Sequence, residues 1–220
     1  MDIQSLLKSA LVENDKARDR SQQTELGASS VGGCRRQAWQ IIHKKPKTNF
    51  QTESLAAIIG TALHATIAES MKNIDPFGED FFIEEGFSTP DLKGHIDLYI
   101  KSTQTVVDWK TSTKKKLAQF PTPQQVMQVN LYGYLLTANG HEVKNVSLVC
   151  IPRDGVMSDV KVWQAPYDPQ LAQEGLAWIR DLQGLTYPPA PEKNYRFCQN
   201  FCEYYNRNAE LEGIGCTGIV

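Results

Sequence analysis

Three short runs between residues 81 and 110 constrain the fold of this chain more than any other feature. The runs "FFIEEGF", "GHIDLYIK" and "TQTVVDWK" have strand-like composition, and Pro, Gly, Ser and Asp residues separate them. Such short separations favour a β-meander. A fourth strand-like run, "KNVSLVCI", occupies residues 144–151, and a fifth is expected at about residues 159–164.

Helical patterns surround these runs. Apolar residues recur at helical spacing through about residues 2–18 and 168–184, and "TESLAAIIGTALHATIAESMK" at 52–72 indicates a longer helix. The segment 121–140 has proline near its start and an Asn-Gly pair at its end, which are helix start and stop signals. The order α-β-β-β-α-β, followed by a strand and a helix, predicts an α/β protein.

The composition is that of an ordinary globular protein, with 220 residues, of which 41% are hydrophobic and 22% charged. The longest apolar runs are too short and too interrupted to span a bilayer, and the N-terminal segment lacks the character of a signal peptide. We therefore expect a cytoplasmic protein without membrane contact. The chain has no G-x-x-x-x-G-K-[ST] phosphate loop, which argues against a nucleotide-driven motor.

Two aspartates and a lysine lie in the second and third strand-like runs. Adjacent strands would bring Asp97 and Asp108 together, and Lys110 shares the face of Asp108 by the period of two. Two close carboxylates repel each other unless a proton or cation lies between them, and oxygen ligands suit Mg²⁺ or Mn²⁺. The lysine would project beside that ion. The alternative is a set of salt bridges on a solvated face of the sheet.

This arrangement resembles the PD-(D/E)XK nucleases, and within them the RecB-like exonucleases. The resemblance covers about residues 52–151, through "GTALH", "GHID", "VVDWK" and "QVNLY". It implies a restriction-endonuclease-like core, in which helices flank a mixed central sheet. It also implies Lys110 as the catalytic lysine and a Mg²⁺ or Mn²⁺ ion held by His64, Asp97, Asp108 and the backbone carbonyl of Trp109.

Further polar residues are candidates for the same site. Gln128 and Tyr132, at i and i+4, share one helical face and are expected to hydrogen-bond the active site or the substrate. Their alternative place is the rim of the core. Either Glu84 or Glu85 is expected to approach the metal, and Glu84 is preferred. His64 on an apolar helix would by itself indicate a core histidine, but the acidic motif downstream favours a metal ligand.

Five cysteines in a cytoplasmic chain argue against a disulfide framework. Cys150 lies in a strand-like run and is interpreted as a buried apolar residue. The other four form a layout of one early and three late residues. That layout, with "SSVGGCRRQAW" around the early cysteine, resembles the CRISPR-associated exonucleases and the nuclease domain of AddB. The resemblance implies a 4Fe-4S cluster on Cys34, Cys198, Cys202 and Cys216.

The spacing of the three late cysteines departs from the usual pattern of that group. Zn²⁺ on the four cysteines is therefore an alternative to the cluster, and unligated thiols are another. The cluster would join the two ends of the chain. The predicted organisation is a helical N-terminal segment at 1–51 with the first cluster cysteine, a nuclease core at 52–185 and a cysteine-rich C-terminal segment at 186–220.

Two basic patches are candidates for DNA binding, although the formal net charge is only -2. A local patch suffices to neutralise phosphates without base specificity. The alternative for each patch is solvated surface. The residues expected to contact the DNA backbone are Arg35, Arg36, Lys114, Lys115 and Lys116.

Together these features predict a metal-dependent DNA exonuclease that hydrolyses phosphodiester bonds in single-stranded DNA or at DNA ends. The expected setting is recombination, repair, phage DNA metabolism or CRISPR adaptation. The lack of a motor implies a helicase, a recombinase or CRISPR adaptation proteins in trans. The alternative is a non-catalytic DNA-binding or assembly subunit with a structural zinc or iron-sulfur site.

Overall fold

The computed structural model describes residues 2–16, 25–49, 55–191 and 195–218. The chain divides into two compact units. The sheet unit comprises Gly27–Gly33 and Ala62–Asp181. The cysteine unit comprises Met1–Leu26, Cys34–Thr61 and Leu182–Val220.

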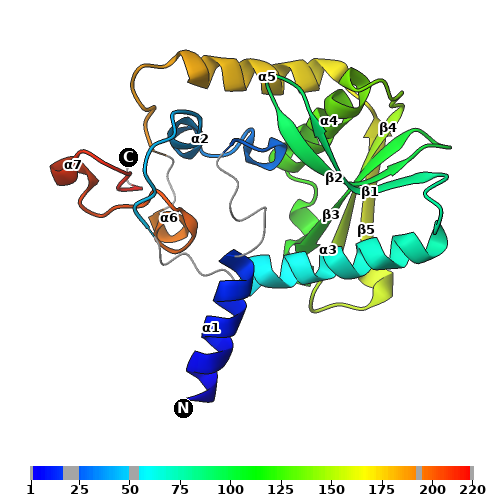
Figure 1. Ribbon diagram of the computed structural model, residues 1–220, viewed down its shortest axis with the longest axis horizontal. Coiled ribbons are helices and arrows are strands. Elements are labelled where there is room, and N and C mark those ends of the chain that lie inside the picture. The colour runs from blue at the N-terminus through cyan, green and yellow to red at the C-terminus, as the bar shows by residue number, and fades with distance from the viewer. Residues whose placement is uncertain (1, 17–24, 50–54, 192–194, 219–220) are drawn as a thin grey trace. The chain divides into compact units, whose positions relative to one another are not determined.

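The sheet unit is built on one five-stranded sheet in the order β1-β2-β3-β4-β5 (Figure 1). Neighbouring strands are antiparallel except β3 and β4, which are parallel, so the sheet is mixed. The predicted meander and mixed sheet are thereby confirmed. The fifth strand lies about two residues beyond its predicted place. The strands are β1 (Phe81–Ser88), β2 (Lys93–Ile100), β3 (Thr105–Ser112), β4 (Asn145–Pro152) and β5 (Lys161–Pro166).

Helices α3 (Leu55–Ile74) and α4 (Pro123–Ala138) cover opposite faces of this sheet (Figure 1). Val107 and Trp109 of β3 are buried in a cluster that Ile67 of α3 joins. Because side chains alternate along a strand, Asp108 and Lys110 of β3 lie on the opposite face, where they contact Gln128 of α4. A short 3₁₀ helix, η3 (Lys114–Gln119), and α4 form the crossover that a parallel pair such as β3 and β4 requires.

Local signals in the sequence explain where α4 lies. It begins at a capping box in which Thr122 accepts from the backbone N–H of Gln125, while the side chain of Gln125 accepts from the N–H of Thr122. Close to that end, Gln124 donates to the carbonyl of Ser29, so the loop 27–33 packs on the helix. Along α4, helix α5 (Pro169–Gly184) approaches closely, because Gly175 leaves no room for a side chain against Met127.

The cysteine unit contains α1 (Ile3–Lys16), α2 (Arg35–Ile42), α6 (Tyr195–Phe201) and the short α7 (Ala209–Glu212). Helix α2 was not predicted, since its residues were interpreted only as a basic patch. Trp39 of α2 is buried and donates to the carbonyl of Leu185 at 2.9 Å. Gln40, also buried, donates to the carbonyl of Gly215. Residues 34–49 are therefore held against the C-terminal part of the chain.

No helix in the described ranges has both the length and the apolar character needed to cross a bilayer. The predicted boundary between residues 51 and 52 lies outside the described residues. The assignment of three domains stays a prediction.

A glycine inside α4 provides a test of this packing. A Cβ at Gly133 would lie 2.6 Å from both Cδ2 and Cε2 of the Tyr167 ring. Alanine improves helix propensity by about 1 kcal/mol over glycine, whereas overpacking costs roughly 1–3 kcal/mol. We expect Gly133→Ala to lower the free energy of unfolding, measured by urea denaturation.

The control is Gly184→Ala at the end of α5, where an added Cβ meets nothing within 4 Å. This variant is expected to be neutral or more stable than the wild type. A Gly133→Ala protein as stable as Gly184→Ala would contradict the close approach of the Tyr167 ring to α4.

Candidate active site

Asp97 and Asp108 are brought together by the β2–β3 pairing. The strands pair antiparallel from Ile100 opposite Thr105 to Leu98 opposite Val107, and the same register continued places Asp97 opposite Asp108. Both aspartates are buried, at 4% and 1% exposed.

The backbone pairing of β2 with β3 ends at Leu98 and Val107, and beyond it the side chain of Asp97 takes the place of a backbone acceptor. Its Oδ2 accepts the backbone N–H of Trp109 at 2.8 Å. The structure thus connects Asp97 to the N–H of Trp109, while the predicted role of the Trp109 carbonyl as a metal ligand stays a prediction.

A first group of side chains comes from three different elements. His64 of α3 points its Nδ1 at Asp97 Oδ2, 3.5 Å away, and at Glu84 Oε1 of β1, 3.7 Å away. One donor atom from each residue lies within 4.8 Å of the others, and among the described residues only these three form such a group. Glu85 is not part of it. The preference for Glu84 over its neighbour agrees with this geometry.

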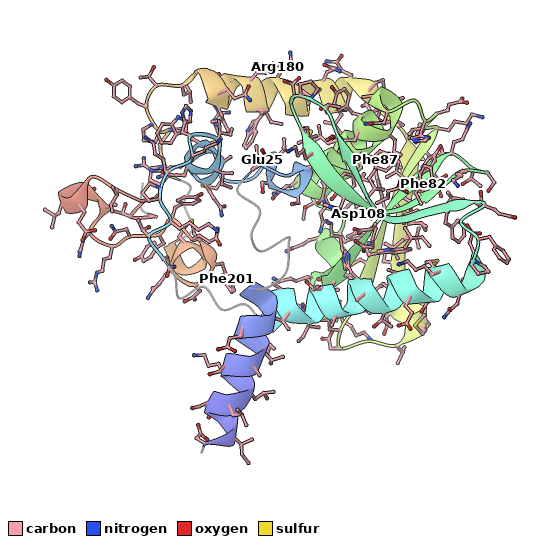
Figure 2. The ribbon with its side chains drawn as sticks, in the orientation of Figure 1. Glu25, Phe82, Phe87, Asp108, Arg180 and Phe201 are labelled. Atoms are coloured by element: carbon pink, nitrogen blue, oxygen red, sulfur yellow. The ribbon has the colours of Figure 1, made fainter. Side chains whose placement is uncertain are left out.

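The backbone of β1 explains how Glu84 reaches this group. Glu84 has a φ of 51°, in the left-handed region that side chains rarely adopt. Phe82 and Phe87 are five residues apart and would face opposite sides of a regular strand. Both rings, labelled in Figure 2, nevertheless pack against the ring of His141, so the alternation changes between them. This local irregularity, in a strand that otherwise pairs normally, is typical of a functional position.

A second group surrounds Asp108 (labelled in Figure 2). Lys110 Nζ lies 3.1 Å from Asp108 Oδ1 and 2.8 Å from Oδ2. Gln128 donates to Asp108 Oδ1 at 3.0 Å and to the hydroxyl of Tyr132 at 2.9 Å, and its Oε1 accepts from Lys110 at 2.8 Å. The structure therefore joins all four of these predicted residues in one hydrogen-bonded chain.

Burial and charge perturb both groups. Burial of the His64 ring opposes protonation, but the carboxylates of Asp97 and Glu84 outweigh it and raise the pKa of His64 to about 10. Burial raises the pKa of Asp108 to about 6, against the opposing effect of Lys110 and with a contribution from Asp97. Titratable groups with such shifts, placed side by side, are typical of functional sites.

The donor atoms fit a hard divalent cation. Carboxylate oxygens are suitable ligands for Mg²⁺ or Mn²⁺, and an imidazole nitrogen is a ligand for first-row transition metals, which include Mn²⁺. Asp108 Oδ2 is buried and, despite its proximity to Lys110, accepts no aligned hydrogen bond from the described residues. A buried carboxylate oxygen without a hydrogen-bond partner has capacity for a further ligand. Asp97 belongs to the compact group of donors, whereas Asp108 lies with the lysine.

The predicted DNA-binding residues differ in their surroundings. Arg36 is half-buried in the cysteine unit, where its Nη1 donates to the carbonyl of Pro189 at 3.1 Å. Lys114 of η3, in the sheet unit, forms an ion pair with Asp159 at 2.9 Å. Lys115 and Lys116 are exposed. The arginine thus has a structural partner, and the two last lysines of the run are presented to solvent.

The four cysteines that resemble cluster ligands line one pocket of the cysteine unit. Cys34 caps the N-terminus of α2, where its sulfur accepts the backbone N–H of Gln37. Burial raises the pKa of the Cys202 thiol to about 12, and the neighbouring thiols of Cys198, Cys34 and Cys216 add to the increase. Residues up to about 180 positions apart in the chain therefore converge.

The sequence analysis missed the loop that follows β4. Arg153 donates its backbone N–H to Ser112 at the end of β3, and Asp154 accepts the N–H of Lys114. This loop therefore supports the lysine run of η3. The Asp-Gly pair at 154–155 signalled a turn, but only the parallel pairing of β3 with β4 places that turn beside the lysines.

Comparisons with known proteins agree with this geometry. A model of the PD-(D/E)XK nuclease superfamily matches residues 15–207. No curated protein matches the chain significantly. The crystal structure of SSO0001 is similar with a TM-score of 0.61 and 18% identity, over 93% of this chain and 95% of that one. An alkaline exonuclease from Laribacter hongkongensis, LHK-Exo, is similar with a TM-score of 0.52 and 13% identity, over 74% and 88%. At these identities the two structures show a shared fold.

The raised pKa of Asp108 has a testable consequence for stability. Its carboxyl binds a proton more tightly in the folded chain than in the unfolded chain, where the pKa has its ordinary value of 3.8. This contribution to stability is complete below the ordinary pKa and is lost as the pH rises through about 6. Asp108→Asn removes it. We therefore expect the variant to gain stability relative to the wild type as the pH rises from 3.8 to about 6.

Urea denaturation of the metal-free proteins in EDTA measures this difference. Asp91→Asn, at an exposed position before β2, is the control and should differ from the wild type by a constant amount. A difference between Asp108→Asn and the wild type that stays constant or falls with pH would contradict the prediction.

Proposed function

We propose that this chain, which belongs to the PD-(D/E)XK nuclease superfamily, is a Mg²⁺- or Mn²⁺-dependent deoxyribonuclease that acts as an exonuclease on DNA ends or single strands. The observation that carries the proposal is the juxtaposition of two groups of side chains around the buried carboxylates of Asp97 and Asp108. One is the compact donor set of His64, Glu84 and Asp97, and the other is Asp108 with Lys110. The alkaline exonuclease activity named for LHK-Exo supports the choice of an exonuclease.

In this proposal His64, Glu84 and Asp97 hold the cation, with Asp108 and the carbonyl of Trp109 as further ligands. When bound, the cation would polarise the scissile phosphate and lower the pKa of a water molecule. The four side-chain donors come from α3, β1, β2 and β3, so folding of the sheet would assemble the site.

Lys110 is proposed as the catalytic lysine. Its ammonium is fixed by Asp108 and by Gln128 Oε1 at 2.8 Å, so it can stabilise negative charge that develops on the phosphate without reorganising. Gln128 is in turn oriented by the Tyr132 hydroxyl. Both residues of α4 are therefore proposed to position Lys110. As the resemblance implies, the product would carry a 5'-phosphate.

End-labelled DNA provides the test of this activity. We expect the wild type to degrade single- or double-stranded DNA with Mn²⁺ and to lose activity in EDTA. Lys110→Met and Asp97→Asn should each reduce the rate at least about 10²-fold, because the first removes a positive charge beside the reacting phosphate and the second removes a carboxylate that would hold the cation. Asp91→Asn, an exposed carboxylate change, is the control and should cleave normally.

Circular dichroism and thermal unfolding are the measurements that check whether each variant is folded. DNA binding by the wild type without cleavage in any divalent metal would contradict the proposal and favour a non-catalytic DNA-binding or assembly subunit. Equal cleavage by the wild type and a rigorously purified Lys110→Met protein would exclude the role of this lysine.

We further propose that the chain belongs to the RecB-like group of CRISPR-associated and AddB nucleases, and that its four converging cysteines bind a 4Fe-4S cluster. Among the described residues, no three of the four thiols form a compact donor group like that of His64, although all four line one pocket. Tetrahedral zinc needs sulfur atoms about 3.8 Å apart. A cluster, whose cysteines bind different irons, suits the wider spacing. The biological setting of the protein and its partner proteins stay predictions.

The cluster is tested by anaerobic purification. We expect a brown protein with about four irons and about four sulfides per chain. Cys202→Ser should lower the iron content and the visible absorption, since it removes a ligand. Cys150→Ser, a buried cysteine of β4 outside the pocket, is the matched control and should keep the iron. A colourless wild type with one zinc per chain would show a zinc site in place of the cluster.

A further inference from the structure

The loop between β4 and β5 (yellow-green in Figure 1) exposes two adjacent apolar side chains at its tip. Val156 is 65% exposed and Met157 is 84% exposed. Covering such a pair with an apolar surface of a ligand would be favourable, because it removes apolar area from water. We call these two residues the apolar tip.

The apolar tip is held in a fixed conformation. The backbone N–H of Val156 donates to Asp159 Oδ2 at 2.8 Å, and the N–H of Asp159 donates to the carbonyl of Val156 at 2.9 Å. Gly155 packs so tightly that a Cβ there would lie 2.6 Å from Pro152 Cγ. The two apolar side chains are therefore presented by a braced turn, which lowers the entropy cost of binding.

Cationic side chains surround this turn. Lys114 Nζ pairs with Asp159 at 2.9 Å, and Lys161 Nζ donates to the carbonyl of Leu117, so η3 lies against the loop. Five cations, of which three are exposed lysines of η3, share this region with only two carboxylates. An apolar tip among cations complements a ligand with both phosphates and flat apolar surfaces. The five are Arg153, Lys114, Lys115, Lys116 and Lys161.

The loop starts beside the strand that carries the proposed catalytic lysine. Pro152 at the end of β4 pairs with Ser112 at the end of β3, and Arg153 donates its backbone N–H to the Ser112 carbonyl at 2.9 Å. Lys110 precedes Ser112 by two residues, or about 7 Å along the strand. The Arg153 side chain also reaches back, since its Nη1 lies 3.5 Å from Thr111 Oγ1. A DNA strand bound at Lys110 would pass close to this loop.

We propose that the apolar tip is a wedge that packs against the base at the end of a DNA duplex and separates it from its pair, while Arg153, Lys115 and Lys116 hold the adjacent phosphates. Aliphatic side chains and methionine unstack bases in this way in other DNA-binding proteins. The proposal rests on the proposed function of the chain, because it assumes DNA as the ligand of this face. It adds the means by which a strand end would be opened beside Lys110.

The test uses the full chain and a duplex with 2-aminopurine as its terminal base. In EDTA, where no hydrolysis is expected, binding of the wild type should increase the fluorescence of this base, because unstacking relieves its quenching. The double variant Val156→Ser with Met157→Gln should bind this duplex about fivefold more weakly or worse, because the apolar contact with the terminal base is lost. It should also lose the fluorescence increase.

The control is Leu211→Gln in α7, which removes an apolar side chain that is 90% exposed but lies between Glu210 and Glu212. This variant should bind and unstack the duplex as the wild type does. Lys115→Ala should weaken binding and lower its salt dependence while it leaves the fluorescence of the bound duplex unchanged.

Unchanged affinity and unchanged fluorescence in the double variant would overturn the wedge. Loss of self-association in the double variant, measured by sedimentation, with unchanged DNA binding would also overturn it and identify a second copy of the chain as the partner of the tip. Failure of the proposed function is distinguishable, because it is measured as the absence of cleavage by the wild type with Mn²⁺. A wild type that unstacks the duplex through the tip without cleaving it would support the wedge alone.

Discussion

Two carboxylates on adjacent strands, Asp97 and Asp108, are buried almost completely, and the elements around them compensate for that burial. Removing a carboxylate from water costs several kcal/mol unless hydrogen bonds and opposite charges replace the lost hydration. Asp97 receives the N–H of Trp109 and faces His64. Asp108 receives Lys110 and Gln128. Elements from both faces of the sheet are therefore tied to one pair of charges.

The two carboxylates are compensated in different ways, and the difference divides the site into two halves. Asp97 lies with a second carboxylate and an imidazole whose pKa is raised to about 10, so a proton provides positive charge where a divalent cation is proposed to bind. Asp108 lies with a lysine that is held by two hydrogen-bond acceptors. In the low dielectric of a buried site, hydrogen bonds of this kind are electrostatically stronger than in water. In the proposed activity, a cation bound beside this ammonium would stabilise the charge that develops on a phosphate.

In the cysteine unit, polar contacts also join segments that lie far apart in the sequence. The backbone N–H groups of Thr48 and Asn49 both donate to the carbonyl of Glu203, and the Lys47 side chain pairs with the carboxylate of the same residue. Holding residues 47–49 against Glu203 closes a long stretch of chain, and this closure costs conformational entropy. A few surface contacts offset this cost only in part. A metal centre on the four cysteines would supply the remaining stabilisation, in the way that structural metal sites contribute folding energy to small units.

The sequence by itself determined most of the helices and strands and the residues that meet at the candidate site. The strand runs, the helix at 123–138 with its proline and Asn-Gly signals, and the residues Asp97, Asp108 and Lys110 could all be predicted, because alternation and capping are local properties of the chain. The resemblance added His64, Gln128 and Tyr132, which the structure joins to those groups. Helix α2 was not predicted because it has only eight residues, half of which are polar.

Only the tertiary structure decided how these residues divide between the two halves of the site. The choice of Glu84 over Glu85 depends on a left-handed φ that no local pattern announces, since glutamate seldom adopts it. The position of the loop at 153–160 beside η3 depends on the parallel pairing of β3 and β4 across a long crossover. Pairings between distant segments depend on how whole helices and strands pack together. Local patterns in the sequence do not specify that packing.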